Sequence, residues 1–114
     1  MSEPKQPVAS ESELPEGSSK LVTVDGKEVA LIRAEGALYA VGNRCPHRSG
    51  PLVRGKVEHV PENPADPSSK TTLAVRCPIH GWLFELSTGR CLTRPSASVP
   101  TYPVECDNGQ ICIG

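Results

Sequence analysis

Two short segments of this 114-residue chain each combine a cysteine, a proline and a histidine. They are Cys45-Pro46-His47 and Cys77-Pro78-Ile79-His80. With one or two residues between cysteine and histidine, a single tight loop can present a thiolate and an imidazole together, and both groups bind metals. The proline beside each cysteine restricts the backbone, so each loop loses less entropy on becoming ordered. The two segments predict one metal centre.

These segments resemble the two ligand loops of the Rieske [2Fe–2S] family, and the resemblance extends over about residues 19–114. In that family two cysteines bind one iron and two histidines bind the other. The resemblance implies a [2Fe–2S] cluster with Cys45 and Cys77 on the first iron and His47 and His80 on the second.

Tetrahedral zinc is the alternative, because two cysteines and two histidines also satisfy its coordination. Zinc sites usually group like ligands as C-x2–4-C and H-x3–5-H pairs, whereas each pair here is mixed. A disulfide between Cys45 and Cys77 would leave both histidines without a role and would need an oxidising compartment. The mixed spacing favours the iron–sulfur interpretation.

The rest of the sequence predicts an all-β chain. Leu21–Val24 and Glu28–Ala34 flank Asp25-Gly26, a dipeptide typical of two-residue hairpin turns. No stretch shows a helical period, and the 10 glycines and 12 prolines indicate many turns.

A second hairpin is predicted around Asn108-Gly109, near the C-terminus. If these two residues form the turn, Cys106 faces Ile111 and Cys112 faces Glu105, so the two thiols point to opposite faces. We therefore predict two buried, small apolar side chains there, with no disulfide.

The resemblance implies the Rieske fold, with small antiparallel sheets in a sandwich or partly open barrel and an inserted cluster-binding subdomain. We predict an acidic, partly flexible N-terminal segment at residues 1–17, in which Val8–Leu14 can lie along the edge of the first strand. The Rieske domain is expected at residues 18–114 and its cluster-binding subdomain at about residues 42–95. Pro95-Ser96-Ala97 stands where the family has a proline loop over the cluster.

The 29 residues between His47 and Cys77 are more than small Rieske ferredoxins usually have. The excess is Pro61–Lys70, whose three prolines and lack of an apolar anchor indicate a surface excursion. A tolerated insertion and a partner-recognition loop both remain open. His59 belongs to neither motif and is assigned to the surface.

The net charge of −1 gives no global electrostatic basis for binding nucleic acid. No apolar run approaches the 18 or so residues of a membrane span, and the N-terminus has no secretory signal pattern. We expect a cytoplasmic protein that binds neither membranes nor nucleic acids. Basic residues near the two motifs either steer an acidic partner or form an ordinary solvated surface; they are Arg44, Arg48, Arg54, Lys56 and Arg76.

Four positions place the chain within the family. Respiratory Rieske proteins carry a disulfide between two extra cysteines, and Gly50 and Ile79 stand at the matching positions. They also place serine and tyrosine hydroxyls near the cluster, where this chain has Trp82 and Phe84. Because hydrogen bonds to sulfur raise the potential, we predict a midpoint potential below about 0 mV, in the low part of the Rieske range.

The sequence shows no site that converts a substrate. After the predicted ligands only His59 remains, too few for an iron site of two histidines and a carboxylate. The resemblance implies a Rieske ferredoxin that carries single electrons from a flavin reductase to a terminal oxygenase. The alternative is the small subunit of an NAD(P)H-dependent nitrite reductase, bound to its large subunit; Cys45–Leu52, Ser87–Leu92 and Pro100–Val104 resemble such subunits.

Overall fold

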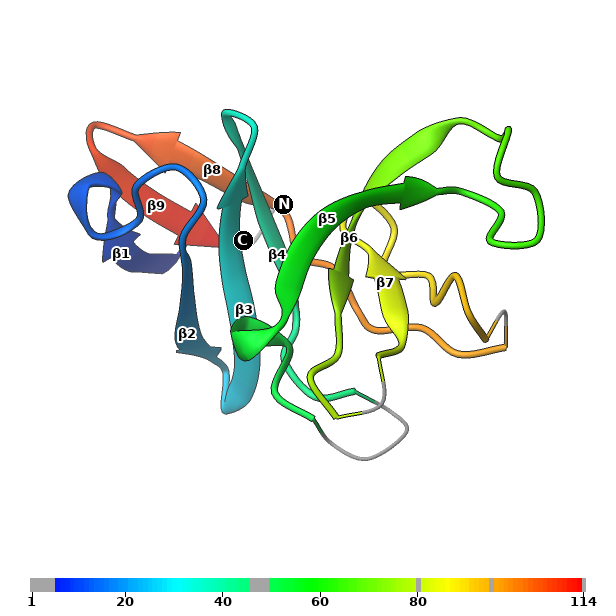
Figure 1. The fold of residues 1–114 in the computed structure, drawn as a ribbon. Coiled ribbons are helices and arrows are strands. Elements are labelled where there is room, and N and C mark those ends of the chain that lie inside the picture. Colours follow the sequence, from blue (N-terminus) through cyan, green and yellow to red (C-terminus); the bar gives the residue numbers. More distant parts are fainter. Residues whose placement is uncertain (1–5, 46–49, 80, 95, 114) are drawn as a thin grey trace, which may run out of the picture.

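A computed structural model describes residues 6–45, 50–79, 81–94 and 96–113. Within these residues the chain forms three antiparallel sheets of three strands each and two short 3-10 helices (Figure 1). The three sheets are separate, so the barrel is open, and the predicted all-β fold is confirmed. No described helix exceeds three residues, and none has the length or apolar character needed to cross a membrane.

The central sheet consists of β2 (Ser19–Val24), β3 (Lys27–Ala34) and β4 (Ala37–Gly42). Its two connections are the dipeptides Asp25-Gly26 and Glu35-Gly36, in which all four residues have positive φ angles between 51° and 78°. Positive φ at both central residues defines the type I′ turn, whose twist matches that of paired strands. The predicted first hairpin is therefore confirmed.

The terminal sheet has the order β1 (Gln6–Ser10), β9 (Gln110–Ile113), β8 (Val104–Asp107). Cys106 pairs with Ile111 and Cys112 with Glu105, as predicted. The expected burial of these two thiols is wrong, because Cys106 is exposed and Cys112 only partly buried. Cys106 is exposed because β8 is an edge strand with solvent along most of its length. Cys112 lies on the central strand β9, on the face opposite to the buried Ile111 and Ile113.

The third sheet consists of β5 (Lys56–Pro61), β6 (Thr71–Arg76) and β7 (Leu83–Glu85), and η2 (Leu52–Arg54) leads into it. It projects to one side of the central sheet (Figure 1). All of it lies within residues 42–95, and the limits of the cluster-binding subdomain stay a prediction.

β3 separates two hydrophobic cores because its side chains alternate between two covered faces. Ala30 and Ile32 face the core toward the third sheet, and Val29 and Leu31 face the core toward the terminal sheet. Besides strand residues, the first of these cores contains the buried side chains of Cys45, Leu52, Cys77, Leu86, Cys91 and Val99.

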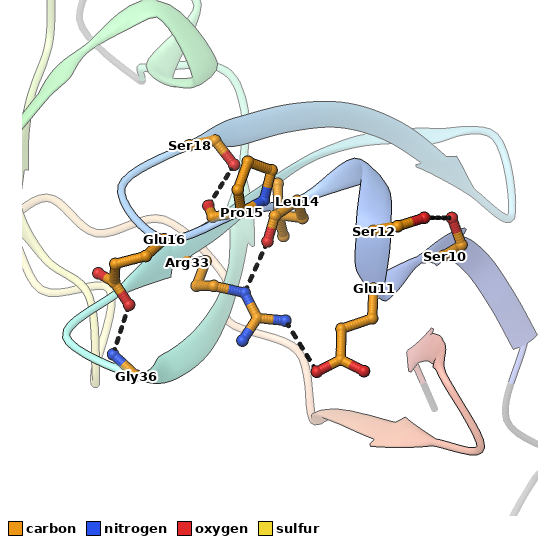
Figure 2. A network of polar contacts seen from close by, with 9 residues as sticks. All are labelled: Ser10, Glu11, Ser12, Leu14, Pro15, Glu16, Ser18, Arg33 and Gly36. Carbon is orange, nitrogen blue, oxygen red and sulfur yellow. Dashed lines mark hydrogen bonds and ion pairs between the residues drawn. The ribbon is translucent and has the colours of Figure 1, made fainter.

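The N-terminal segment packs onto the domain through Arg33 and Glu16 (Figure 2). Arg33 Nε donates to the carbonyl of Leu14 at 2.6 Å, and the Glu16 carboxylate accepts the backbone N–H of Gly36 at 2.8 Å. Upstream, β1 pairs with β9 instead of lying along β2, which corrects the placement expected for Val8–Leu14. The division into residues 1–17 and 18–114 stays a prediction.

Leu14 makes this attachment strong, because its side chain is fully buried in the core beside the terminal sheet. We expect Leu14→Ala to reduce the free energy of unfolding by about 2–5 kcal/mol, measured by chemical denaturation. The matched control is Leu21→Ala, at a position that is 44% exposed, where a loss below about 1 kcal/mol is expected. Equal small losses at both positions would contradict the packing of this segment.

Residues 62–70 form the excursion predicted from the prolines. The backbone N–H of Glu62 donates to the carbonyl of Lys70 at 2.8 Å, which extends the β5–β6 ladder by one step. Beyond it, turns close through Asn63 and Asp66, and hydrogen bonds from Ser68 lower the pKa of Asp66. Both the surface excursion and the surface position of His59, which is exposed and pairs with Glu35, are confirmed.

Candidate metal centre

Two loops at the same end of the molecule carry the predicted cysteines (Figure 1). The first follows β4 and closes at its base, where the Cys45 N–H donates to the Gly50 carbonyl at 3.0 Å. The second follows β6, and the Cys77 N–H donates to the Trp82 carbonyl at 2.8 Å. Gly81 has φ +75° and donates its N–H to the Cys77 carbonyl at 2.9 Å, so this turn needs the left-handed conformation that favours glycine.

The two cysteines lie in one core, and their loops meet at Gly50. Each cysteine is only 2% exposed. An ideal Cβ built on Gly50 would lie 2.6 Å from the Cys77 sulfur and 2.7 Å from Cγ1 of Ile79. Position 50 therefore requires glycine for lack of space.

The same geometry brings positions 50 and 79 as close together as the two residues of a disulfide. That ideal Cβ on Gly50 would lie 3.5 Å from Cβ of Ile79, at the short end of the range found in disulfides. Positions 50 and 79 are thus neighbours, but glycine and isoleucine cannot form a bridge. All five cysteines lie in the described part of the chain, and the structure has no disulfide among them.

His47 and His80 lie outside the described residues, as do Pro46, Arg48 and Pro95. Among the described residues no group of three or more metal-binding side chains is assembled. The four-ligand assignment therefore stays a prediction, and so does the covering role of Pro95-Ser96-Ala97.

The described half of the centre fits an iron–sulfur cluster. Thiolate sulfur is the donor that such clusters take from proteins, and buried surroundings tune their potentials. Cys45 and Cys77 supply two thiols from touching loops, in a core that also contains Leu52, Val75 and Phe84. The two cysteines are thus placed to hold one side of a cluster against the protein interior.

Two aromatic residues follow the second loop. Phe84 is fully buried, and Trp82 is half-buried with the guanidinium of Arg94 located 5.5 Å from its ring centroid. Neither ring carries an O–H, so neither can donate the hydroxyl hydrogen bonds that raise Rieske potentials. The cation–π contact between Arg94 and Trp82 depends on the tertiary fold, and sequence spacing alone did not reveal it.

The basic residues near the loops are partly neutralised. Arg44 forms an ion pair with Glu28 at 3.2 Å, and Arg76 pairs with Glu58 through two N–H groups. Hydrogen bonding from Arg76 lowers the pKa of Glu58, and the same pairing raises the pKa of Arg76. Among the described residues no acidic side chain forms an ion pair with Arg54 or Lys56. The local positive charge is therefore smaller than the sequence suggests.

Asn43 is a structural residue that sequence reasoning missed. It is 3% exposed, and its side-chain oxygen accepts the N–H of Val53 at 2.8 Å while its carbonyl accepts the N–H of Leu52 at 2.7 Å. These bonds fix the return of the first loop into η2. No pattern in the sequence marks Asn43, because a polar residue at a strand end usually lies at the surface.

Comparison with known proteins agrees with this geometry. The family model of the Rieske-like [2Fe–2S] domain matches residues 5–114. The ferredoxin component of a naphthalene 1,2-dioxygenase system from Pseudomonas aeruginosa is 34% identical over 102 residues, covering 89% of this chain and 86% of that protein.

Two solved structures match nearly end to end. A Mycobacterium tuberculosis protein described as an NADH-dependent nitrite reductase small subunit gives a TM-score of 0.82 at 30% identity, covering 99% of this chain and 96% of that one. The ferredoxin of carbazole 1,9a-dioxygenase from Nocardioides aromaticivorans IC177 gives 0.78 at 25% identity, covering 97% of both chains. The chain belongs to the Rieske-like [2Fe–2S] domain family, whose cofactor is a [2Fe–2S] cluster.

Proposed function

We propose that this protein is a Rieske ferredoxin that carries single electrons from a flavin reductase to a terminal oxygenase. The observation that carries the proposal is the 34% identity with a dioxygenase ferredoxin component along nearly the whole of both chains. The buried cysteines at the contact of two loops support it, because this arrangement suits a cluster.

The proposed ligands are Cys45 and Cys77 for the first iron and His47 and His80 for the second. When bound, the cluster supplies a reversible one-electron couple. The protein's own contribution is to bury the two thiols, to lock each loop at its base and to surround them with apolar side chains. Burial excludes water from the cysteine side.

The absence of hydroxyl groups on Trp82 and Phe84 predicts a low potential. We expect a midpoint below about 0 mV in a redox titration, within a family range of roughly −150 to +300 mV. A value well above about +100 mV would contradict the assignment to the ferredoxin branch of the family.

The role as a carrier is tested by reconstitution with purified components. A flavin reductase, NADH and a ring-hydroxylating oxygenase are combined with the holoprotein, and hydroxylated product is measured per NADH consumed. We expect product formation to depend on the cluster-loaded protein and to stop when Cys77→Ala replaces it. If the reductase reduces the holoprotein but none of several oxygenases then forms hydroxylated product, this result would argue against the carrier role.

The second candidate is the small subunit of a nitrite reductase, and the TM-score of 0.82 with such a subunit favours it. It predicts a stable complex with a large nitrite reductase subunit, measurable by co-purification, instead of weak encounters with a free reductase. Either role places the protein in the cytoplasm, which we propose because five cysteines without a disulfide suit a reducing compartment. Cell fractionation tests that placement.

A further inference from the structure

Arg76 ends β6 immediately before Cys77, and its side chain makes three contacts. Nε donates to Glu58 Oε2 at 2.9 Å, and the second guanidinium N–H group donates to Glu58 Oε1 at 3.0 Å. The third nitrogen donates to the carbonyl of Gly81 at 3.4 Å, a longer and weaker bond. One side chain thus connects β5 with the far end of the second ligand loop.

The strand register explains why this pair forms. Lys56 lies opposite Arg76 and Glu58 lies opposite Ala74, so Glu58 is the diagonal neighbour of Arg76 on the same face. A long side chain reaches that diagonal position, and the planar guanidinium matches a carboxylate through two parallel hydrogen bonds. Bidentate pairing restrains Arg76 more than a single contact would, which leaves its remaining N–H groups aimed at the loop.

The contact with Gly81 falls where the loop is least restrained by its own sequence. Gly81 has φ +75°, and glycine moves between conformations more readily than other residues. Its N–H is held by the Cys77 carbonyl, and its own carbonyl is held by Arg76. Because a peptide unit is planar, fixing the Gly81 carbonyl also fixes the direction of the Trp82 N–H.

We propose that Glu58 and Arg76 are positioning residues, which hold the Gly81–Trp82 peptide in one orientation and so control cluster retention and the electronic signature of the second ligand loop. This inference rests on the proposed function only in requiring that the protein binds the cluster. It concerns neither reductase nor oxygenase.

The chain contains a matched control at the other loop. Arg44 precedes Cys45 as Arg76 precedes Cys77, and it also pairs with a glutamate, Glu28, on a neighbouring strand. Its pairing uses one nitrogen, its side chain is 65% exposed against 43% for Arg76, and among the described residues it donates to no loop carbonyl. Arg44→Gln removes a similar charge and ion pair without removing a hydrogen bond to a loop carbonyl among the described residues.

The experiment compares the holoproteins Arg76→Gln, Arg76→Lys, Glu58→Gln and Arg44→Gln with the wild type. Cluster release into excess iron chelator is followed through the visible absorption, and the reduced proteins are compared by EPR. We expect release about five- to tenfold faster in Arg76→Gln, as for loss of a charge-assisted hydrogen-bonded pair, with broader EPR lines from a less uniform loop. Glu58→Gln should change both readouts in the same direction, and Arg44→Gln should leave both at wild-type values.

The directions in which the midpoint potential changes distinguish a positioning role from an effect of charge alone. If charge alone acted, Arg76→Gln would lower the midpoint potential and Glu58→Gln would raise it, with release rates unchanged, and this outcome would overturn the proposal. Arg76→Lys keeps the positive charge but loses the bidentate hydrogen bonding with Glu58. Fast cluster release from this variant therefore supports the positioning role even if Arg76→Gln fails to fold. The double variant Glu58→Gln/Arg76→Gln should be no faster than Arg76→Gln, because both act on one contact. A wild-type protein without a cluster would instead refute the proposed function itself.

Discussion

Cys77→Ala is expected to yield protein without iron or inorganic sulfide and without visible colour. The Cys77 thiol is 2% exposed and is one of the two thiols that the loops bring into one core. Histidines supply the other two predicted ligands, so loss of one of two thiolates removes half of the protein ligands of the first iron. Iron and sulfide analysis of the purified variant measures this effect directly.

A third buried cysteine provides the control for this substitution. Cys91 is 1% exposed in the same core, and its sulfur lies 3.4 Å from the hydroxyl of Thr93. Cys91→Ala removes a buried thiol of equal size, so it should cost similar stability but keep a full cluster. Retention of the cluster in Cys77→Ala, or equal loss in both variants, would refute the assigned ligands.

Gly50→Ala is expected to have the second largest effect, loss of most of the bound cluster. The added methyl group would lie 2.6 Å from the Cys77 sulfur and 2.7 Å from a carbon of Ile79, so the two loops must separate. The φ angle of Gly50 is outside the left-handed region, and the effect is therefore steric and not conformational. Cluster content and the chelator release rate measure it.

Gly26→Ala serves as the comparison, because an ideal Cβ there meets nothing within 4 Å while φ is +78°. This variant should lose about 1 kcal/mol of stability through backbone strain and keep its cluster. The two glycines then separate crowding at the loop contact from general destabilisation. If Gly50→Ala binds a full cluster, the two loops do not meet as the structure places them.

Local sequence signals predicted the hairpins well. Asp25-Gly26 and Asn108-Gly109 adopt the paired positive φ angles that type I′ turns require, and a two-residue turn fixes the register of the strands beside it. That register correctly predicted the opposition of Cys106 and Ile111. It could not predict how deeply Cys106 is buried, because burial depends on β8 lying at a sheet edge.

Contacts between distant segments could not be predicted from the sequence. The pairing of β1 with β9 joins the two ends of the described chain, and nothing in Gln6–Ser10 specifies that partner. The pairing of Arg76 with Glu58 requires the β5–β6 register, which spans the excursion at residues 62–70. The sequence therefore counted Arg76 as a surface cation, where the structure shows a paired one.

The candidate site was predicted through its motifs. The mixed cysteine and histidine spacing pointed to the correct family, and the resemblance correctly indicated that positions 50 and 79 are neighbours. The contact of Gly50 with the Cys77 sulfur needed the structure, because no local pattern reports how two loops from different strands approach each other.

The measurement that tests the central claim most directly is EPR spectroscopy of the dithionite-reduced protein, with iron, sulfide and zinc counted on the same sample. The protein is prepared once with natural histidine and once with ¹⁵N-labelled histidine, so that hyperfine couplings from ligand nitrogens can be assigned. We expect about two irons and two sulfides per chain, a reduced-cluster signal and couplings from two histidine nitrogens that change with the label. Stoichiometric zinc without a signal, or a cluster without histidine couplings, would contradict the account.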